Sequence, residues 1–318
     1  MSGALPVIDF AGFAGALPDE ARQRTIAAQI GAACRENGFF ALSNHAIDRA
    51  LIDDAFAMAQ HFFDLPRAQK QKITIAHSPC HRGWFAHGEE ALAKVEQPQG
   101  DYKEGLKIGR DLPPDHVRVK AALPLHGANQ YPEERDALVG FRAKMDALYG
   151  ACEALSRQLM QAFALSLDLP SDHFDHWLSE PMATLAPLRY PPMQQAAELS
   201  AGAHTDFGCL TLLFQHDVPG LQIKTATGWQ DVPLLEDAII VNIGDMMERW
   251  TGGLYGSTVH RVVNRSSNTR HSMAYFFDPD PEADLTPLPG CANNQTAPLT
   301  ALDHLLTKID ASFDYRNH

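Results

Sequence analysis

The feature that most constrains the fold is a series of short apolar runs between residues 182 and 277. Seven runs of five to nine residues stand there: MATLAPLRY, CLTLLFQ, LQIKT, WQDVP, AIIVNIG, STVHRVVN and RHSMAYFF. Turn-forming pairs separate them, for example Pro219–Gly220 and Gly252–Gly253. Many short strands at this interval are typical of a β-sandwich or jelly roll. We therefore expect this part of the chain to form a jelly-roll core.

The rest of the chain carries mainly helical patterns. Helices are expected over residues 18–38, 46–66, 132–167 and 299–310, and short strands over residues 5–10 and 39–45. Residues 75–130 show no sustained period, and we expect loops and short strands there, over the mouth of an active site. Helices, then strands, then one last helix fit an α+β fold with helices packed outside the strand core.

Composition and charge exclude several classes of function. The 318 residues include 26 Lys and Arg against 39 Asp and Glu, so the formal net charge is −13. Such a chain is a poor partner for nucleic acid or an anionic membrane, and we expect neither. The five cysteines are odd in number and lack C-x-x-C spacing, which is typical of a reduced, cytoplasmic protein. We see no signal peptide and no uninterrupted apolar stretch of 18 residues.

Two histidines and one aspartate form a candidate metal site. His204 and Asp206 lie two residues apart at the start of an apolar run, so on one strand they would share a face. His260 follows 56 residues later in another β-rich run, and in a jelly roll strands that far apart can be neighbours. Two imidazoles and one carboxylate form the facial triad of non-haem Fe(II) oxygenases, which leaves coordination positions open.

A second pair of residues suggests what fills those positions. Arg270 and Ser272 follow His260 by ten and twelve residues and would also share one face of a strand. A guanidinium group beside a hydroxyl is a good clamp for a carboxylate. A 2-oxo acid could bind the iron with its keto and C1-carboxylate oxygens and the arginine with its distal carboxylate.

Together these motifs resemble the isopenicillin N synthase-like group of Fe(II)/2-oxoglutarate-dependent dioxygenases. The resemblance extends nearly from end to end of the chain. Its further landmarks are LPVIDF, GFFALSNHAID, LRYPP, DVPGLQI, GWQDVP and VNIGDMMERWTGG. It implies an α+β fold with a double-stranded β-helix core and with N-terminal and flanking helices. It also implies three regions packed as one structural unit: an N-terminal region over 5–112, the dioxygenase core over 181–281 and a C-terminal helix over 297–312.

The resemblance also implies a site and an activity. Fe(II) would be held by His204, Asp206 and His260, and the co-substrate carboxylate by Arg270, Ser272 and Tyr190. With O2 and 2-oxoglutarate, such an enzyme oxidises an unactivated C–H bond of a small molecule by hydroxylation, desaturation or cyclisation. Succinate and CO2 are released.

One residue departs from many members of that group, and several alternatives stay open. Arg189 stands where many plant members carry an aromatic residue. Its context, together with Gly88–Glu90, is similar to the bacterial ethylene-forming enzyme, so ethylene formation is one alternative. Others are a 2-oxoglutarate-independent oxidase of the same fold, a catalytically decayed binding protein and a zinc hydrolase.

Four residues are candidates for contacts to the primary substrate, which the sequence does not name. By analogy they are Arg189, Phe207, Leu221 and Phe276, together with the loop around residues 80–105. A regular strand would send Arg189 to the face opposite Tyr190, whereas a β-bulge would bring both side chains into the pocket. Our hypothesis is that Arg189 reaches the pocket and holds a carboxylate.

Overall fold

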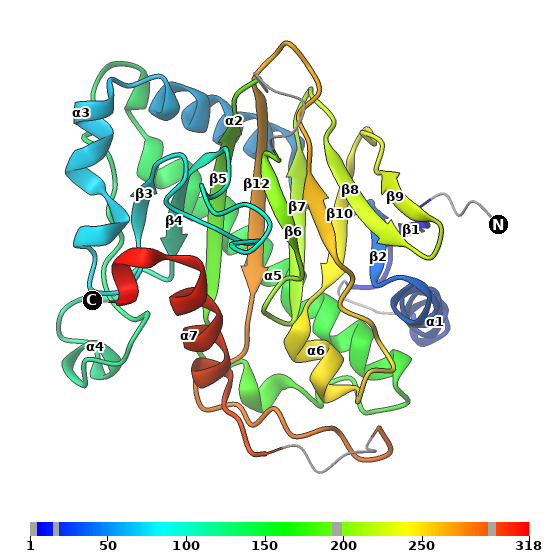
Figure 1. Ribbon diagram of the computed structural model, residues 1–318. Coiled ribbons are helices and arrows are strands. Elements are labelled where there is room, and N and C mark those ends of the chain that lie inside the picture. The colour runs from blue at the N-terminus through cyan, green and yellow to red at the C-terminus, as the bar shows by residue number, and fades with distance from the viewer. Residues whose placement is uncertain (1–4, 15–18, 193–198, 292–296, 318) are drawn as a thin grey trace.

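Two β-sheets form the centre of the protein. The computed structural model describes residues 5–14, 19–192, 199–291 and 297–317 (Figure 1). In these ranges the larger sheet has the strand order β1 (Val7–Asp9), β2 (Phe39–Ser43), β10 (Ala238–Ile243), β7 (Leu210–Gln215), β12 (Arg270–Phe277), β5 (Ala183–Tyr190), β4 (Glu104–Gly109) and β3 (Gly83–Phe85). The smaller sheet has the order β6 (Ala201–His204), β11 (His260–Val262), β8 (Leu221–Thr225) and β9 (Gly228–Asp231). This arrangement is the expected jelly roll.

Strand β12 organises the larger sheet because it is paired on both sides. It runs antiparallel to β5 from Arg270 opposite Tyr190 to Phe277 opposite Ala183, and antiparallel to β7 on its other edge. Alternate residues of these strands therefore face the same side of the sheet. One face carries the side chains that line a cavity between the two sheets, and the other packs against helices.

Three long helices cover the outer face of the larger sheet: α1 (Glu20–Glu36), α2 (Arg49–Phe63) and α5 (Phe141–Ser166). Figure 1 shows α5 behind the strands. The side chains of Asp19 and Asp48 accept hydrogen bonds from the first amides of α1 and α2, which fixes where these helices begin. Residue 18, where we expected the first helix to start, lies outside the described residues.

The third helix is shorter than the sequence pattern suggested. We expected a helix over residues 132–167, but α5 begins only at Phe141. Gly140 immediately before it has a left-handed backbone with φ of 83°, which a continuous right-handed helix cannot contain. Residues Asp136–Leu138 form a separate 3₁₀ turn.

The remaining helices are short or lie near the cavity. They are α3 (Arg67–Lys70), α4 (Val117–Lys120), α6 (Asp245–Trp250) and α7 (Ala301–Ser312), with 3₁₀ turns at Gln71–Ile73, Ile75–His77, Asp136–Leu138, Asp175–Trp177 and Asp314–Asn317. Helix α7 lies in front of the larger sheet in Figure 1, on the side opposite α5. Its Leu305 and Ile309 contribute to the cavity wall. In the described ranges, no helix is both long enough and apolar enough to cross a membrane.

Candidate metal and co-substrate site

The register of the smaller sheet brings two histidines together. His204 ends β6 and His260 begins β11, and the two residues are directly opposite in the antiparallel pair. Their ring centroids lie 4.3 Å apart. Asp206 lies in the loop after β6 rather than on the strand. The loop, and not the shared strand face that we expected, brings it close to His204. Within the described residues, these three form the one group of His, Cys, Asp and Glu whose ligand atoms lie within 4.8 Å of one another.

Hydrogen bonds from outside the cluster orient all three side chains. The Nδ1 atoms of His204 and His260 lie 2.7 and 3.1 Å from the carbonyl oxygens of Gly202 and Thr258. Because a carbonyl oxygen only accepts, each Nδ1 carries the proton and each Nε2 presents a lone pair. These two Nε2 atoms lie 3.7 and 3.6 Å from the same Oδ1 of Asp206. Three donor atoms therefore converge, as a divalent metal requires.

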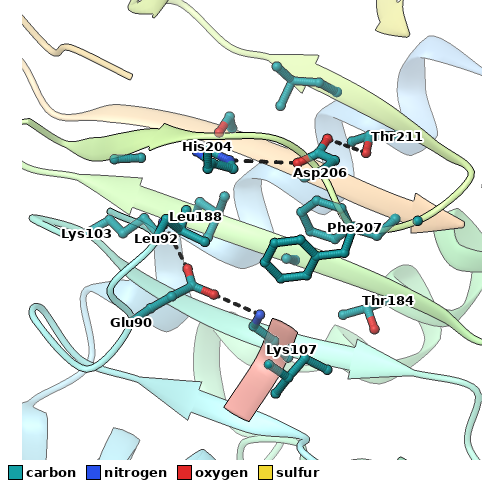
Figure 2. A pocket seen from close by; sticks show the side chains of 18 of the residues that line it. Glu90, Leu92, Lys103, Lys107, Thr184, Leu188, His204, Asp206, Phe207 and Thr211 are labelled. Atoms are coloured by element: carbon teal, nitrogen blue, oxygen red, sulfur yellow. Dashed lines mark hydrogen bonds and ion pairs between the residues drawn. The ribbon is translucent and has the colours of Figure 1, made fainter. Parts of the chain in front are cut away.

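The Asp206 carboxylate is held by two neighbours on the larger sheet. Its Oδ2 accepts hydrogen bonds from the hydroxyl of Thr211 at 2.5 Å and from the amide of Asn242 at 2.7 Å. Figure 2 shows Asp206 between Thr211 and His204. These bonds leave Oδ1 for the metal. We did not predict a role for Thr211 or Asn242 from the sequence, although Thr211 is a polar residue within an otherwise apolar strand pattern.

The electrostatics of the cluster favour a metal ligand set. Burial, reinforced by the charge of His260, lowers the pKa of His204 to about 4, although the charge of Asp206 opposes the change. His204 is therefore neutral at pH 7. Imidazole nitrogens with a carboxylate suit Fe(II), so the donor set fits this ion.

Arg270 lies at the other end of the same cavity. It is fully buried at the start of β12, directly opposite Tyr190 on β5, and its guanidinium carbon lies 4.9 Å from the centre of the Tyr190 ring. It donates to the hydroxyl of Ser272 at 3.1 Å and reaches Gln215 at 3.5 Å. Among the described residues its Nε has no hydrogen-bond partner and no carboxylate pairs with it. A buried guanidinium without an anion fits the distal carboxylate of a 2-oxo acid.

The cavity connects these two groups. Its volume is about 150 Å³. Phe207, Leu221 and Phe276 all line it, as do Tyr190, Arg270 and Ser272. The floor is mostly apolar and is formed by inward-facing residues of β5 and β12, among them Leu188 and Ala274.

Arg189 does not line the cavity, and our hypothesis that it reaches the pocket is wrong. Strand β5 pairs with β12 without a bulge, so Arg189 and Tyr190 face opposite sides. Arg189 donates from Nε to Glu104 at 2.7 Å and from Nη1 to Asp64 at 3.0 Å. Its guanidinium also lies 5.6 Å from the centre of the Phe63 ring. It is an ion-pairing residue on the helix-covered face.

A charged wall of the cavity was not foreseen. Lys103 and Lys107 extend from around β4 into the cavity, and both bind Glu90, each at 2.9 Å (Figure 2). Lys103 also pairs with Asp101 at 2.6 Å. The alternation of Lys103, Gly105, Lys107 and Gly109 is a strand pattern that could have predicted this wall. Glycines and charged residues are also typical of loops, however, so we did not assign a strand to this segment.

Asp278 is a further buried acid at the cavity that the sequence did not indicate. It follows β12, and its Oδ1 has no hydrogen-bond partner in the described part of the chain. Burial and then the charge of Asp206 raise the pKa of Asp278 to about 8, against a weaker effect of the Cys209 amide. It is therefore largely protonated at pH 7 in the metal-free protein.

Comparison with known proteins decides the family. Residues 181–279 match the 2OG-Fe(II) oxygenase superfamily, and residues 5–134 match the N-terminal region described as non-haem dioxygenase in morphine synthesis. A 2-oxoglutarate-Fe(II) type oxidoreductase, hxnY, from Emericella nidulans is 34% identical over 91% of this chain and 83% of its own length. The chain belongs to the 2OG-Fe(II) oxygenase superfamily. This 2OG-Fe(II) oxygenase is therefore an enzyme that uses Fe(II), 2-oxoglutarate and O2.

Two other relatives extend the comparison to nearly the full chain. The 2-oxoglutarate-dependent dioxygenase citB of Monascus ruber is 33% identical over 98% of this chain and 96% of its own. The crystal structure of a full-length Neurospora crassa protein in complex with alpha-KG and thymine superimposes with a TM-score of 0.84. It is 29% identical, and the match covers 98% of each chain. The fold of this 2OG-Fe(II) oxygenase is thus the jelly roll of its family.

Proposed function

We propose that this oxygenase oxidises a C–H bond of a small molecule bound in the cavity between its two sheets. Fe(II) is held by His204, Asp206 and His260, and the distal carboxylate of 2-oxoglutarate is held by Arg270 and Ser272 against Tyr190. The observation that carries the proposal is the convergence of three metal-donor atoms and one anion-free buried arginine on a single cavity. Phe207, Leu221 and Phe276 form part of the surface that meets the substrate.

The residues of the chain position and shield the reaction. Gly202 and Thr258 keep both imidazoles in the metal-binding tautomer, and Thr211 and Asn242 hold Asp206 in place. When bound, the iron and 2-oxoglutarate supply the oxidation: O2 is reduced while 2-oxoglutarate is converted to succinate and CO2. The apolar floor and α7 exclude water from the site, which protects a reactive centre from side reactions.

Several finer features complete the proposal. The three regions 5–112, 181–281 and 297–312 act as one structural unit, because the last contributes α7 to the cavity of the core. The substrate is a small molecule rather than nucleic acid or a membrane lipid, in keeping with the net charge of −13. The small size of the cavity and the thymine bound to the Neurospora protein support this class. We place the enzyme in the cytoplasm on the strength of its unpaired cysteines.

The test is an anaerobic titration with Fe(II) followed by 2-oxoglutarate, monitored through the visible charge-transfer band. His204→Ala, Asp206→Ala and His260→Ala should each remain folded and lose iron binding, whereas the exposed His61→Ala serves as the control. Arg270→Lys should bind iron but require about tenfold or more 2-oxoglutarate, since lysine lacks the bidentate fork. Full iron binding by any of the three alanine variants would remove that residue from the ligand set.

The products distinguish the remaining alternatives. Succinate formed from 2-oxoglutarate is expected, and an oxidase of the same fold that does not use this co-substrate would form none. Ethylene in the headspace would indicate the ethylene-forming reaction, for which Arg189 no longer gives an argument because it lies outside the cavity. Failure of the wild-type protein to bind iron would favour a decayed binding protein. Turnover with zinc in place of iron would favour a hydrolase.

A further inference from the structure

The wall of the cavity next to β4 carries a positive charge that the protein itself does not neutralise. Lys103, Lys107 and Arg82 line this wall, and the acids paired with it are Glu90 and Asp101. Two lysines and two carboxylates balance. Arg82 has no carboxylate partner in the described part of the chain, so one positive charge is left over.

Arg82 is fixed in position by its contacts with backbone. It is 6% exposed, and its guanidinium donates to the carbonyl oxygens of Leu125 at 3.1 Å and His81 at 3.4 Å. Gly109 of β4 makes room for it, because a Cβ at that position would lie 2.0 Å from the guanidinium. A buried cation without an anion is costly to fold, and the cost is recovered if a ligand supplies the anion.

Two neighbouring groups have hydrogen-bonding capacity to spare. His81 is buried, its Nδ1 lies 2.5 Å from the hydroxyl of Tyr315, and its Nε2 has no partner among the described residues. The Lys107 ammonium has three N–H donors, of which one is satisfied by Glu90. Lys107 also lies 5.0 and 5.7 Å from the ring centres of Phe313 and Phe85, which hold it beside the cavity.

We propose that Lys107, Arg82 and His81 form a carboxylate-binding subsite, and that the primary substrate is a small monocarboxylic acid. The inference rests on the proposed function of the cavity. One excess positive charge matches one carboxylate better than a phosphate dianion. The apolar body of the acid then lies along the floor of Leu188 and Ala274, toward the three proposed iron ligands. The substrate anion is thus bound by a different wall from the one that holds 2-oxoglutarate.

The test compares a carboxylate with its uncharged amide on the complete enzyme. Benzoate and benzamide are titrated by calorimetry into the anaerobic protein loaded with Fe(II) and saturating 2-oxoglutarate, which fills the Arg270 site. Benzoate should bind about tenfold or more tightly than benzamide. Lys107→Met should weaken benzoate about tenfold and leave benzamide within about twofold, because the variant removes the charge while Glu90 keeps its ion pair with Lys103.

Matched variants separate this subsite from general effects. Lys94→Met removes an equally charged but half-exposed lysine paired with Asp314, and it should change neither affinity. Lys107→Arg should restore most of the benzoate affinity. Arg82→Lys tests the second cation, provided that its melting temperature stays near that of the wild type.

Three results would overturn the inference: equal affinities for benzoate and benzamide, no binding of either ligand, or an unchanged benzoate affinity in Lys107→Met. The charge-transfer band recorded on the same samples shows whether the iron and 2-oxoglutarate sites are intact. A normal band with no preference for the carboxylate would contradict the proposed subsite but not the proposed function. A missing band in the wild type means instead that the proposed function has failed.

Discussion

At the scale of single residues, Arg189 and Tyr190 show that neighbouring positions on one strand can have different roles. Its neighbour Tyr190 faces the cavity, whereas Arg189 faces the helices and joins Glu104 to Asp64. Glu104 is almost fully buried and also accepts from Lys70 at 2.8 Å and Trp84 at 2.7 Å. A buried carboxylate needs all of these partners, so Arg189 belongs to the stability of the protein.

We expect Arg189→Met to lower the free energy of unfolding by about 1–3 kcal/mol, because Glu104 loses one charged partner but keeps Lys70 and the indole N–H of Trp84. Iron content and the KM for 2-oxoglutarate should not change. Chemical denaturation and steady-state kinetics measure the two effects. Arg49→Met is the control, since its ion pairs with Asp53 and Asp237 are exposed and should contribute below about 1 kcal/mol. A raised KM with unchanged stability would return Arg189 to the site.

At the scale of elements, the junction between β10 and α6 fixes the loop that carries Asp206. The amide of Asp245, the first residue of α6, donates to the Asp206 carbonyl at 2.8 Å, and that of Met246 donates to Gly208 at 3.1 Å. Gly244 at the junction allows this approach. A Cβ there would lie 2.5 Å from the Gly208 carbonyl oxygen and 2.7 Å from that of Asp206. The six-residue helix therefore positions Asp206, one of the three proposed metal ligands.

Gly244→Ala should weaken iron binding and lower the melting temperature, because the added methyl group pushes the 206–208 loop away from α6. Gly150→Ala on α5 is the matched control. Among the described residues, no atom beyond the neighbouring helix backbone lies within 4 Å of a Cβ at Gly150, so the same change there should be neutral or stabilise by up to about 1 kcal/mol. Iron titration and thermal melting measure both variants. Normal iron affinity in Gly244→Ala would show that the loop tolerates the shift.

At the scale of the whole molecule, the end of the described chain closes the cavity built by its middle. Phe313, which is buried, lies 4.8 Å from His81 and 5.8 Å from Phe85 between ring centroids. Ala91 donates to the carbonyl of Ser312 at 2.9 Å. Residues 301–317 and the loop over 81–92 are therefore in contact beside β4, and we expect them to open together.

Phe313→Ala should loosen both halves of this wall, because truncating a buried phenylalanine costs about 3 kcal/mol. Hydrogen exchange should become faster in residues 301–317 and 81–92, while β12 keeps its protection. Tyr315→Phe keeps the ring packing and removes only the hydroxyl with its contacts to His81 and Arg316, so its exchange should change little. Faster exchange confined to residues 301–317 would mean that the two segments are independent.

Local patterns alone determined much of this protein. The short apolar runs predicted a jelly roll, and each run became a strand because its turn residues and alternation are local properties. The four expected helices formed with shifted ends, since capping by Asp48 or a left-handed Gly140 depends on single backbone positions. The H-x-D pair and the later histidine predicted the three-residue cluster, because residue type and spacing are properties of the sequence itself.

Tertiary structure decided what depends on which surfaces meet. The register of β6 on β11 placed His204 opposite His260, and the unbroken pairing of β5 with β12 turned Arg189 away from the cavity. The second wall, with Lys107 and Arg82, joins segments whose sequences carry no sustained period. Its lysines pair with Glu90 and Asp101 across irregular segments, whereas Arg82 meets only backbone carbonyl groups, and no local pattern records such pairing. Sequence thus indicated the three candidate ligands and the strands, and packing decided which side chains line the cavity.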